Sequence, residues 1–146
     1  MIPSLILWFT LFTLRPSTRP IQAPDPSPEA QEIASVIRQQ LDAFTFNNYE
    51  EAYRLVSKKT KDRLSLDQYA QMVRAEYPEI TKSLSVSLGE IRFAPDPTHA
   101  TARVEITGFN HKKVTAEYQM IREEEGWRVD GITITTLRAR GPIGWG

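Results

Sequence analysis

Apolar residues recur every three or four positions through the first half of the chain, the spacing that places them on one face of a helix. The first run follows the helix-starting pair Ser27-Pro28 and contains Ile33, Ile37, Leu41 and Phe44. A second, short run spans residues 49–57, and a third follows the capping-box pattern that begins at Ser65. Pro78 ends this part, because the residue before a proline disfavours helical geometry. We therefore predict three helices.

After Pro78 the apolar period changes from 3.6 residues to two, which is typical of strands with one buried face. The alternating runs are separated by three turns, at residues 95–98, 110–112 and 123–126. The alternation changes phase at Gly89-Glu90 and again at Asp130-Gly131. A phase change of this kind indicates a β-bulge, and two bulges in a small sheet indicate strong bending. The second half is therefore predicted to be a meander of about four antiparallel strands.

Helices followed by strands define an α+β domain, with the helices packed on one face of the sheet. A chain of 146 residues is long enough for one such domain with an adequate core. We place this domain at residues 29–137 and predict that its bent sheet wraps the long first helix as a cone with an interior pocket.

The N-terminus has a different composition from the rest. The run Leu5 to Leu14 is nearly all apolar, too short to span a bilayer as a straight helix but as long as the apolar part of a signal peptide. No Lys or Arg precedes the apolar run, and Arg15 and Arg19 follow it, which is the wrong side for the usual orientation of such a segment in the membrane. Residues 1–23 are therefore interpreted as a cleaved export signal or a retained membrane anchor, with a cytoplasmic tail or misplaced start as alternatives.

The export interpretation predicts a periplasmic or extracellular protein, or one anchored by this segment, with no other membrane contact. Five prolines lie in residues 15–28, and an extended proline-rich linker is predicted to remain at residues 24–28 after cleavage. Residues 138–146 are predicted to form a flexible tail.

Charge and composition exclude several classes of function. Eighteen basic residues balance eighteen acidic ones, so the chain lacks the basic excess of nucleic-acid-binding proteins. The absence of cysteine excludes thiol catalysis, disulfides and thiolate metal sites. The two histidines, His99 and His111, fall in predicted turns, where solvent exposure is the usual outcome. We predict no metal and no cofactor.

The order of elements resembles the nuclear transport factor 2-like superfamily, over about residues 30–137. Within it, the sequences "MVRAEYP", "GEIRF" and "AEYQMIREEEGWRVDGI" are similar to a bacterial domain family of unknown function. The matching positions are Met72, Val73, Arg74, Tyr77, Pro78, Gly126, Trp127, Arg128 and Val129. The resemblance implies the cone fold, and implies that sheets of two copies can pair face to face into a homodimer, a contact that Tyr118 and Trp127 would permit.

Aromatic and acidic residues supply the pocket candidates. Tyrosine hydroxyls and aromatic rings could floor an apolar pocket, or could simply pack in the core with each hydroxyl satisfied at a rim. Glu105 and Glu117 lie on neighbouring strands, where they either line the cone or face water beside Arg103 and Lys113. No residue is identified as catalytic. The pocket candidates are Tyr53, Tyr69, Tyr77, Glu105, Glu117, Tyr118 and Trp127.

The functional hypothesis is an exported domain that binds a small apolar ligand or a protein partner without catalysis. The alternative is an isomerase- or dehydratase-like enzyme that uses a buried carboxylate or tyrosine. A cluster of basic residues beside Ser57 is interpreted as a solvated helix face, with binding to acidic lipid or a partner as the alternative; its members are Lys58, Lys59, Lys61 and Arg63.

Overall fold

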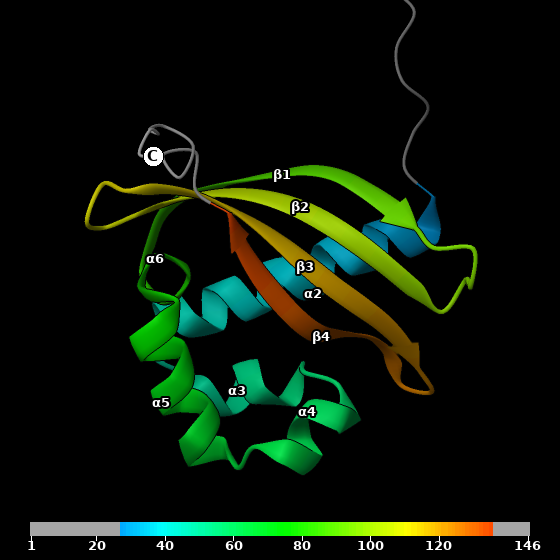
Figure 1. Ribbon diagram of the computed structural model, residues 1–146, viewed down its shortest axis with the longest axis horizontal. Coiled ribbons are helices and arrows are strands. Elements are labelled where there is room, and N and C mark those ends of the chain that lie inside the picture. The colour runs from blue at the N-terminus through cyan, green and yellow to red at the C-terminus, as the bar shows by residue number, and fades with distance from the viewer. Residues whose placement is uncertain (1–26, 136–146) are drawn as a thin grey trace, which may run out of the picture.

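Helices come first along the chain and strands second, and the helices cover one face of a single sheet (Figure 1). The computed structural model describes residues 27–135. The predicted export signal, most of the linker and the C-terminal tail lie outside these residues. The helices are α2 (Pro28–Thr45), α3 (Tyr49–Arg54), α4 (Lys58–Arg63), α5 (Leu66–Glu76) and α6 (Pro78–Thr81). The strands are β1 (Ser83–Phe93), β2 (His99–Gly108), β3 (Lys113–Glu123) and β4 (Gly126–Thr135).

The three predicted helices correspond to α2, α3 and α5, and their caps form as the sequence indicates. Ser27 Oγ accepts a hydrogen bond from the Ala30 amide at 3.1 Å, and Pro28 occupies the first helical position. Ser65 and Gln68 form the reciprocal capping box of α5. These side chains satisfy amides that a helix start leaves without intrahelical partners.

Two short helices, α4 and α6, were not predicted. Helix α4 has the sequence KKTKDR and contains no buried residue, so it carries no apolar repeat to recognise. Pro78 ends α5 as predicted, but it also begins α6, because its fixed φ suits the first position of a helix. Among residues 27–135 no helix is long and apolar enough to cross a membrane.

The sheet is an antiparallel meander in the order β1-β2-β3-β4. The register of β1 against β2 shifts between Leu88 and Ile91, which places a bulge at the predicted Gly89-Glu90. The register of β4 against β3 passes from Val129 to Gly131 and leaves Asp130 outside the pairing, which confirms the second bulge. Both phase changes in the sequence therefore correspond to bulges.

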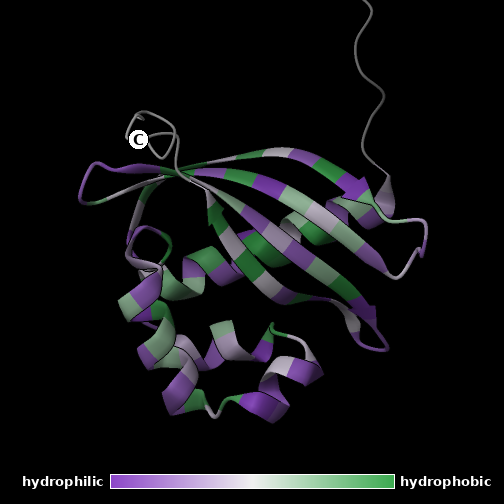
Figure 2. Cartoon of the chain, in the orientation of Figure 1, coloured by the Kyte–Doolittle hydropathy of each residue, from purple (hydrophilic) through white to green (hydrophobic). Residues whose placement is uncertain are grey.

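The core lies between the sheet and α2. Alternate residues of β2 and β3 are buried against the helices, and the intervening residues are partly or fully exposed. The matching alternation of hydrophobic and hydrophilic residues along the strands is visible as stripes in Figure 2. Ile33, Ile37 and Phe44 of α2 are completely buried against this face. The α+β prediction is therefore confirmed.

Contacts between the two ends of the described chain hold α2 on the last strand. Glu32 Oε2 accepts a hydrogen bond from the backbone amide of Trp127 at 3.2 Å. Arg122, near the end of β3, forms an ion pair with Glu29 in the first turn of α2. The N-terminal half of α2 is thus tied to the turn between β3 and β4.

Candidate functional site

The candidate site is a groove between α4, α5 and β4, which we call the helix–sheet groove. Its volume is about 170 Å³. Apolar side chains form most of its lining, and Thr60, Arg63, Tyr77 and Asp130 add polar groups. The lining residues are Val56, Thr60, Arg63, Leu64, Tyr69, Met72, Val73, Tyr77, Val129, Asp130, Gly131 and Ile132.

Backbone hydrogen bonds fasten the helical layer to the sheet at one side of the groove. The residues between α3 and α4 run beside β4, where Val56 and Val129 form a parallel bridge. The Val129 amide donates to the Leu55 carbonyl, and the Ser57 amide donates to the Val129 carbonyl, each at 2.9 Å. This side of the groove is therefore fixed by main-chain bonding.

Asp130, the bulged residue of β4, extends this junction through its side chain. Ser57 is buried, and its hydroxyl donates to Asp130 Oδ1 at 2.7 Å while it accepts from the Thr60 amide as the N-cap of α4. Lys59 Nζ lies 3.6 Å from Asp130 Oδ2. A bulge redirects the side chain of its extra residue. Here it sets a carboxylate against the start of α4.

Tyr69 and Tyr77, both predicted pocket residues, line the groove from α5 and its C-cap. The Tyr77 hydroxyl donates to the Ile132 carbonyl at 3.2 Å and so connects the end of α5 to β4. The Tyr69 hydroxyl accepts from the buried Gln40 Nε2 at 3.2 Å. Burial raises the pKa of both tyrosines, most strongly that of Tyr69. Both hydroxyls are therefore protonated at neutral pH.

The other predicted aromatic residues lie outside the groove lining. Tyr53 is partly buried, and its hydroxyl donates to the Leu64 carbonyl beside the groove. Tyr118 and Trp127 are completely buried in the core behind it. Burial, followed by the nearby Tyr69 hydroxyl, raises the pKa of Tyr118. Within residues 27–135 the Tyr118 hydroxyl, Trp127 Nε1 and Gln40 Oε1 have no protein hydrogen-bond partner.

Glu105 and Glu117 lie on the outer face of the sheet, opposite to the helices. Glu105 is exposed, and Glu117 Oε2 lies 3.9 Å from Arg103 Nη2 across the β2–β3 pair. This is the water-facing alternative of the two that the sequence allowed. The structure therefore brings Tyr69 and Tyr77 together at the groove, places Tyr53 at its edge and separates both glutamates from it.

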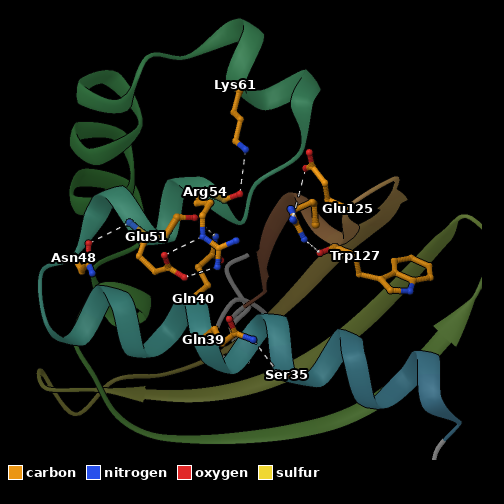
Figure 3. A network of polar contacts seen from close by, with 11 residues as sticks. Ser35, Gln39, Gln40, Asn48, Glu51, Arg54, Lys61, Glu125 and Trp127 are labelled. Atoms are coloured by element: carbon orange, nitrogen blue, oxygen red, sulfur yellow. Dashed lines mark hydrogen bonds and ion pairs between the residues drawn. The ribbon is translucent and has the colours of Figure 1, made fainter.

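Two of the four side chains of the basic cluster around α4 are engaged in local contacts. Besides the Lys59–Asp130 ion pair, Lys61 Nζ donates to the Arg54 carbonyl at 3.1 Å, and Arg54 pairs with Glu51 (Figure 3). Within residues 27–135 neither Lys58 nor Arg63 forms an ion pair, and of the four cluster residues only Arg63 lines the groove. The cluster is therefore a helix surface in which Lys59 and Lys61 have local partners and Arg63 places one cation at the groove.

Sequence reasoning missed Asp130, Thr60 and Arg63 as groove residues. A signal for Asp130 was present, since the phase change at Asp130-Gly131 already marked a bulge, and bulges redirect side chains. No comparable signal marks Thr60 and Arg63, because α4 has no apolar repeat from which its orientation could be inferred. Their position depends on the tertiary contact between Ser57 and Asp130.

Metal-binding chemistry finds no support among residues 27–135, where no group of three His, Asp or Glu side chains could hold an ion. His99 begins β2 rather than lying in a turn, and its half-exposed ring contacts Asp96 at 3.1 Å. Hydrogen bonds from the Thr98 amide and hydroxyl, with a smaller effect of His99, lower the pKa of Asp96. His111 is exposed in the β2–β3 turn, with a φ of 65°.

A helical layer packed on a bent four-stranded antiparallel sheet is the fold that solved structures described as nuclear transport factor 2-like or cystatin-like share with this chain. The chain belongs to the family described as "Domain of unknown function (DUF4864)", whose model matches residues 26–142. The α+β fold that the superfamily resemblance implied is confirmed by solved structures. No curated protein matches the sequence.

Solved structures share this fold at low sequence identity. A domain of unknown function with a cystatin-like fold from Nostoc punctiforme superposes with a TM-score of 0.56 at 16% identity, over 80% of this chain and 83% of that one. A protein of unknown function from Shewanella oneidensis, similar to nuclear transport factor 2, has a TM-score of 0.53 at 11% identity, over 72% and 97%. A phospholipid-binding protein from Ralstonia solanacearum, solved with a phospholipid, has a TM-score of 0.51 at 14% identity, over 76% and 80%. At these identities the likeness concerns the fold.

Proposed function

We propose that this chain is a non-catalytic binding domain whose helix–sheet groove takes a small apolar ligand. The observation that carries the proposal is the groove itself, which combines an apolar lining with two neutral tyrosine hydroxyls. Small-molecule sites typically combine apolar walls with a few polar groups that orient the ligand. The phospholipid bound by the Ralstonia protein is compatible with apolar ligands in this fold.

The size of the groove restricts the ligand class. Its volume of about 170 Å³ is well below that of typical drug-sized sites, roughly 300 to 1,000 Å³. It is close to the cavity of about 150 Å³ that binds benzene in an engineered protein. We therefore infer that the groove holds a group of roughly benzene size, either a whole small molecule or the apolar end of a larger one.

Arg63 and the groove tyrosines set the polarity of such a ligand. Among residues 27–135 the Arg63 guanidinium has no ion-pair partner, so it favours an anionic or polar group at the groove. The Tyr77 hydroxyl already donates to Ile132, and the Tyr69 hydroxyl retains its own proton for a ligand oxygen. A small amphipathic molecule with an oxygen or carboxylate at one end fits this arrangement.

Export is part of the proposal and rests on the sequence alone. The apolar run Leu5–Leu14 followed by a proline-rich linker is typical of a segment that a peptidase removes or a membrane retains. We propose that the binding domain works outside the cytoplasm. Fractionation of the producing cell, with the N-terminus of the isolated protein sequenced, tests this; a cytoplasmic chain with residues 1–23 intact contradicts it.

Methionine methyl signals provide the test of ligand binding, because the chain contains only three methionines, Met1, Met72 and Met120. Met72 lines the groove, whereas Met120 is buried in the sheet core. We would label methionine methyl groups with ¹³C in the full chain and titrate benzene, phenol and hexanoate. The proposal expects a saturable shift of the Met72 signal with little change at Met120. No shift at Met72, or equal shifts at both, contradicts it.

A matched pair of substitutions locates the effect. Ile132 lines the groove, and Ile134 follows it on the same strand outside the groove lining. Ile132→Phe should fill the groove and reduce the Met72 shift roughly tenfold at a fixed probe concentration, in line with a loss of about 1.4 kcal/mol in binding. Ile134→Phe should leave the Met72 shift unchanged. Equal behaviour of the two variants would place binding elsewhere.

The alternative, an isomerase- or dehydratase-like enzyme, is favoured by one observation: the carboxylate of Asp130 lines the same groove as Tyr69 and Tyr77. Its hydrogen bond from Ser57 and its ion pair with Lys59 occupy both carboxylate oxygens. The protonated tyrosines cannot accept a proton as bases. Turnover of a small hydroxy or keto substrate that Asp130→Asn abolishes would replace the binding proposal with this one.

A further inference from the structure

The free edge of β1 carries a palindromic sequence. Within residues 27–135 this strand pairs only with β2, so the other edge of its backbone is open. Residues 84–88 read Leu-Ser-Val-Ser-Leu in both directions along the chain. Exposed edges of this kind are templates for pairing with another strand, and proteins usually protect them with charges, prolines or bulges. In β1 the Gly89-Glu90 bulge and the charges Glu90 and Arg92 lie beyond this segment, while a second register irregularity lies at its first residue, Leu84, and leaves residues 85–88 regularly paired with β2.

The apolar side chains of the palindrome are poorly covered. Leu84 is 58% exposed and Val86 37% exposed. Their neighbours Leu88 and Ile91 are only partly buried, along a shallow groove beside α2. The helix thus covers the C-terminal half of β1 and leaves the N-terminal half open. Apolar surface at an unpaired strand edge favours association with a partner that continues the sheet.

We propose that a second copy of this chain pairs with residues 84–88 of β1 as an antiparallel strand around a twofold axis at Val86. Such an axis sets each residue of the regular segment 85–87 across from its own kind, and Val86 faces the partner's Val86. Ser85 likewise faces the partner's Ser87 on the opposite side of the joined sheet. A twofold interface must be self-complementary, and the regular residues 85–87 of the palindrome meet this condition.

This edge pairing differs from the face-to-face dimer that the superfamily resemblance implied. Tyr118 and Trp127 are completely buried against the helices and cannot contact a partner. The outer face of β2 presents Thr101, Arg103, Glu105 and Thr107, a polar surface. The edge of β1 offers the less polar contact. The inference does not depend on the helix–sheet groove or its ligand.

Cysteine cross-linking tests the register directly, because the full-length chain contains no cysteine of its own. In Val86→Cys the two thiols face each other across the axis. In the control Leu84→Cys the two substituted residues are four positions apart along the pair, about 14 Å, beyond the roughly 7 Å that a disulfide can span. A mild oxidant accepts the two electrons and two protons released when the disulfide forms.

The expected result is a covalent dimer of Val86→Cys that forms at least roughly tenfold faster than that of Leu84→Cys, as the disulfide distance limit requires. Light scattering should show that Val86→Lys, which opposes two ammonium groups on the axis, reduces the dimer fraction without changing the circular dichroism spectrum. Equal cross-linking of Val86→Cys and Leu84→Cys, or a monomeric wild-type chain at high concentration, would overturn the proposal.

Discussion

Ser57→Ala should destabilise the domain more than the loss of a helix cap alone. The Ser57 hydroxyl caps α4 and also donates a charge-assisted hydrogen bond to Asp130 across the junction with β4. An N-cap serine contributes about 1 kcal/mol, and a hydrogen bond to a charged group about 1.5 to 3 kcal/mol. Asp130 has a side-chain exposure of 16%, and Lys59 remains 3.6 Å away, so the bond lies toward the lower end of that range. We expect a total loss of about 2 to 3 kcal/mol.

Ser65→Ala is the matched control. Ser65 caps α5 at an exposed position and accepts from the Gln68 amide, but it has no side-chain bond to the sheet. Its loss should cost about 1 kcal/mol. The difference between the two variants therefore isolates the Ser57–Asp130 hydrogen bond. With a total stability of 5 to 15 kcal/mol for a typical domain, both variants should remain folded.

Urea unfolding followed by far-ultraviolet circular dichroism measures both losses. The melting temperature of Ser57→Ala should fall by roughly 10 °C, about twice the fall in Ser65→Ala. A double-mutant cycle with Asp130→Ala should give a coupling energy of about 1 to 2 kcal/mol between Ser57 and Asp130. If Ser57→Ala costs no more than Ser65→Ala and the coupling is zero, the junction does not hold α4 on β4, and the account of the groove wall is wrong.

Three further predictions concern the core, one turn and high pH. Tyr118→Phe should leave the free energy of unfolding unchanged or raise it by about 1 kcal/mol, because the hydroxyl has no hydrogen-bond partner in the described part of the chain. Tyr69→Phe should cost about 1 kcal/mol through its bond to Gln40, and a larger loss in Tyr118→Phe, measured by urea unfolding, refutes this. Gly126→Ala should lower the free energy of unfolding by about 1 to 2 kcal/mol, since φ at Gly126 is 131° and the added Cβ would lie 2.7 Å from Glu32 Oε2. An unchanged melting temperature would count against this prediction. Burial raises the pKa of Tyr69, Tyr77 and Tyr118 above the unfolded value. Their contribution to the free energy of unfolding is therefore complete below about pH 10 and is lost as the pH rises above it. Unfolding measured against pH, with tyrosinate absorbance, should show this decline, and a flat profile to about pH 12 contradicts it.

Much of the fold follows from period and capping alone. The apolar repeats of α2 and α5, the capping box at Ser65 and the change to a two-residue period each have a direct counterpart in the structure. The bulges were predictable because a phase change requires an extra residue in the ladder. Helices α4 and α6 were not, because α4 is polar throughout and α6 is a single turn that begins at a proline normally associated with a helix end.

The site was only partly predictable from the sequence. Tyr69 and Tyr77 were identified because buried aromatic residues with hydroxyls are common in pockets. The face of the sheet that carries Glu105 and Glu117 remained ambiguous. Strand alternation divides residues between two faces, but it does not indicate which face the helices cover when both faces contain polar residues. The groove residues Thr60 and Arg63 depend on the pairing of Val56 with Val129, a contact between segments far apart in the chain.

The contacts between α2 and the β3–β4 turn also constrain the order in which the chain can fold during synthesis. Glu32 and Trp127 are 95 residues apart, and Glu29 and Arg122 are 93 apart. At a synthesis rate of roughly 5 to 20 residues per second, α2 waits about 5 to 20 seconds for these partners. During that interval the buried face of α2, including Ile33 and Ile37, has no completed sheet to pack against. The first helix of the domain is thus among the last to be locked in place, and a nascent chain stays open to chaperones until its final strand emerges.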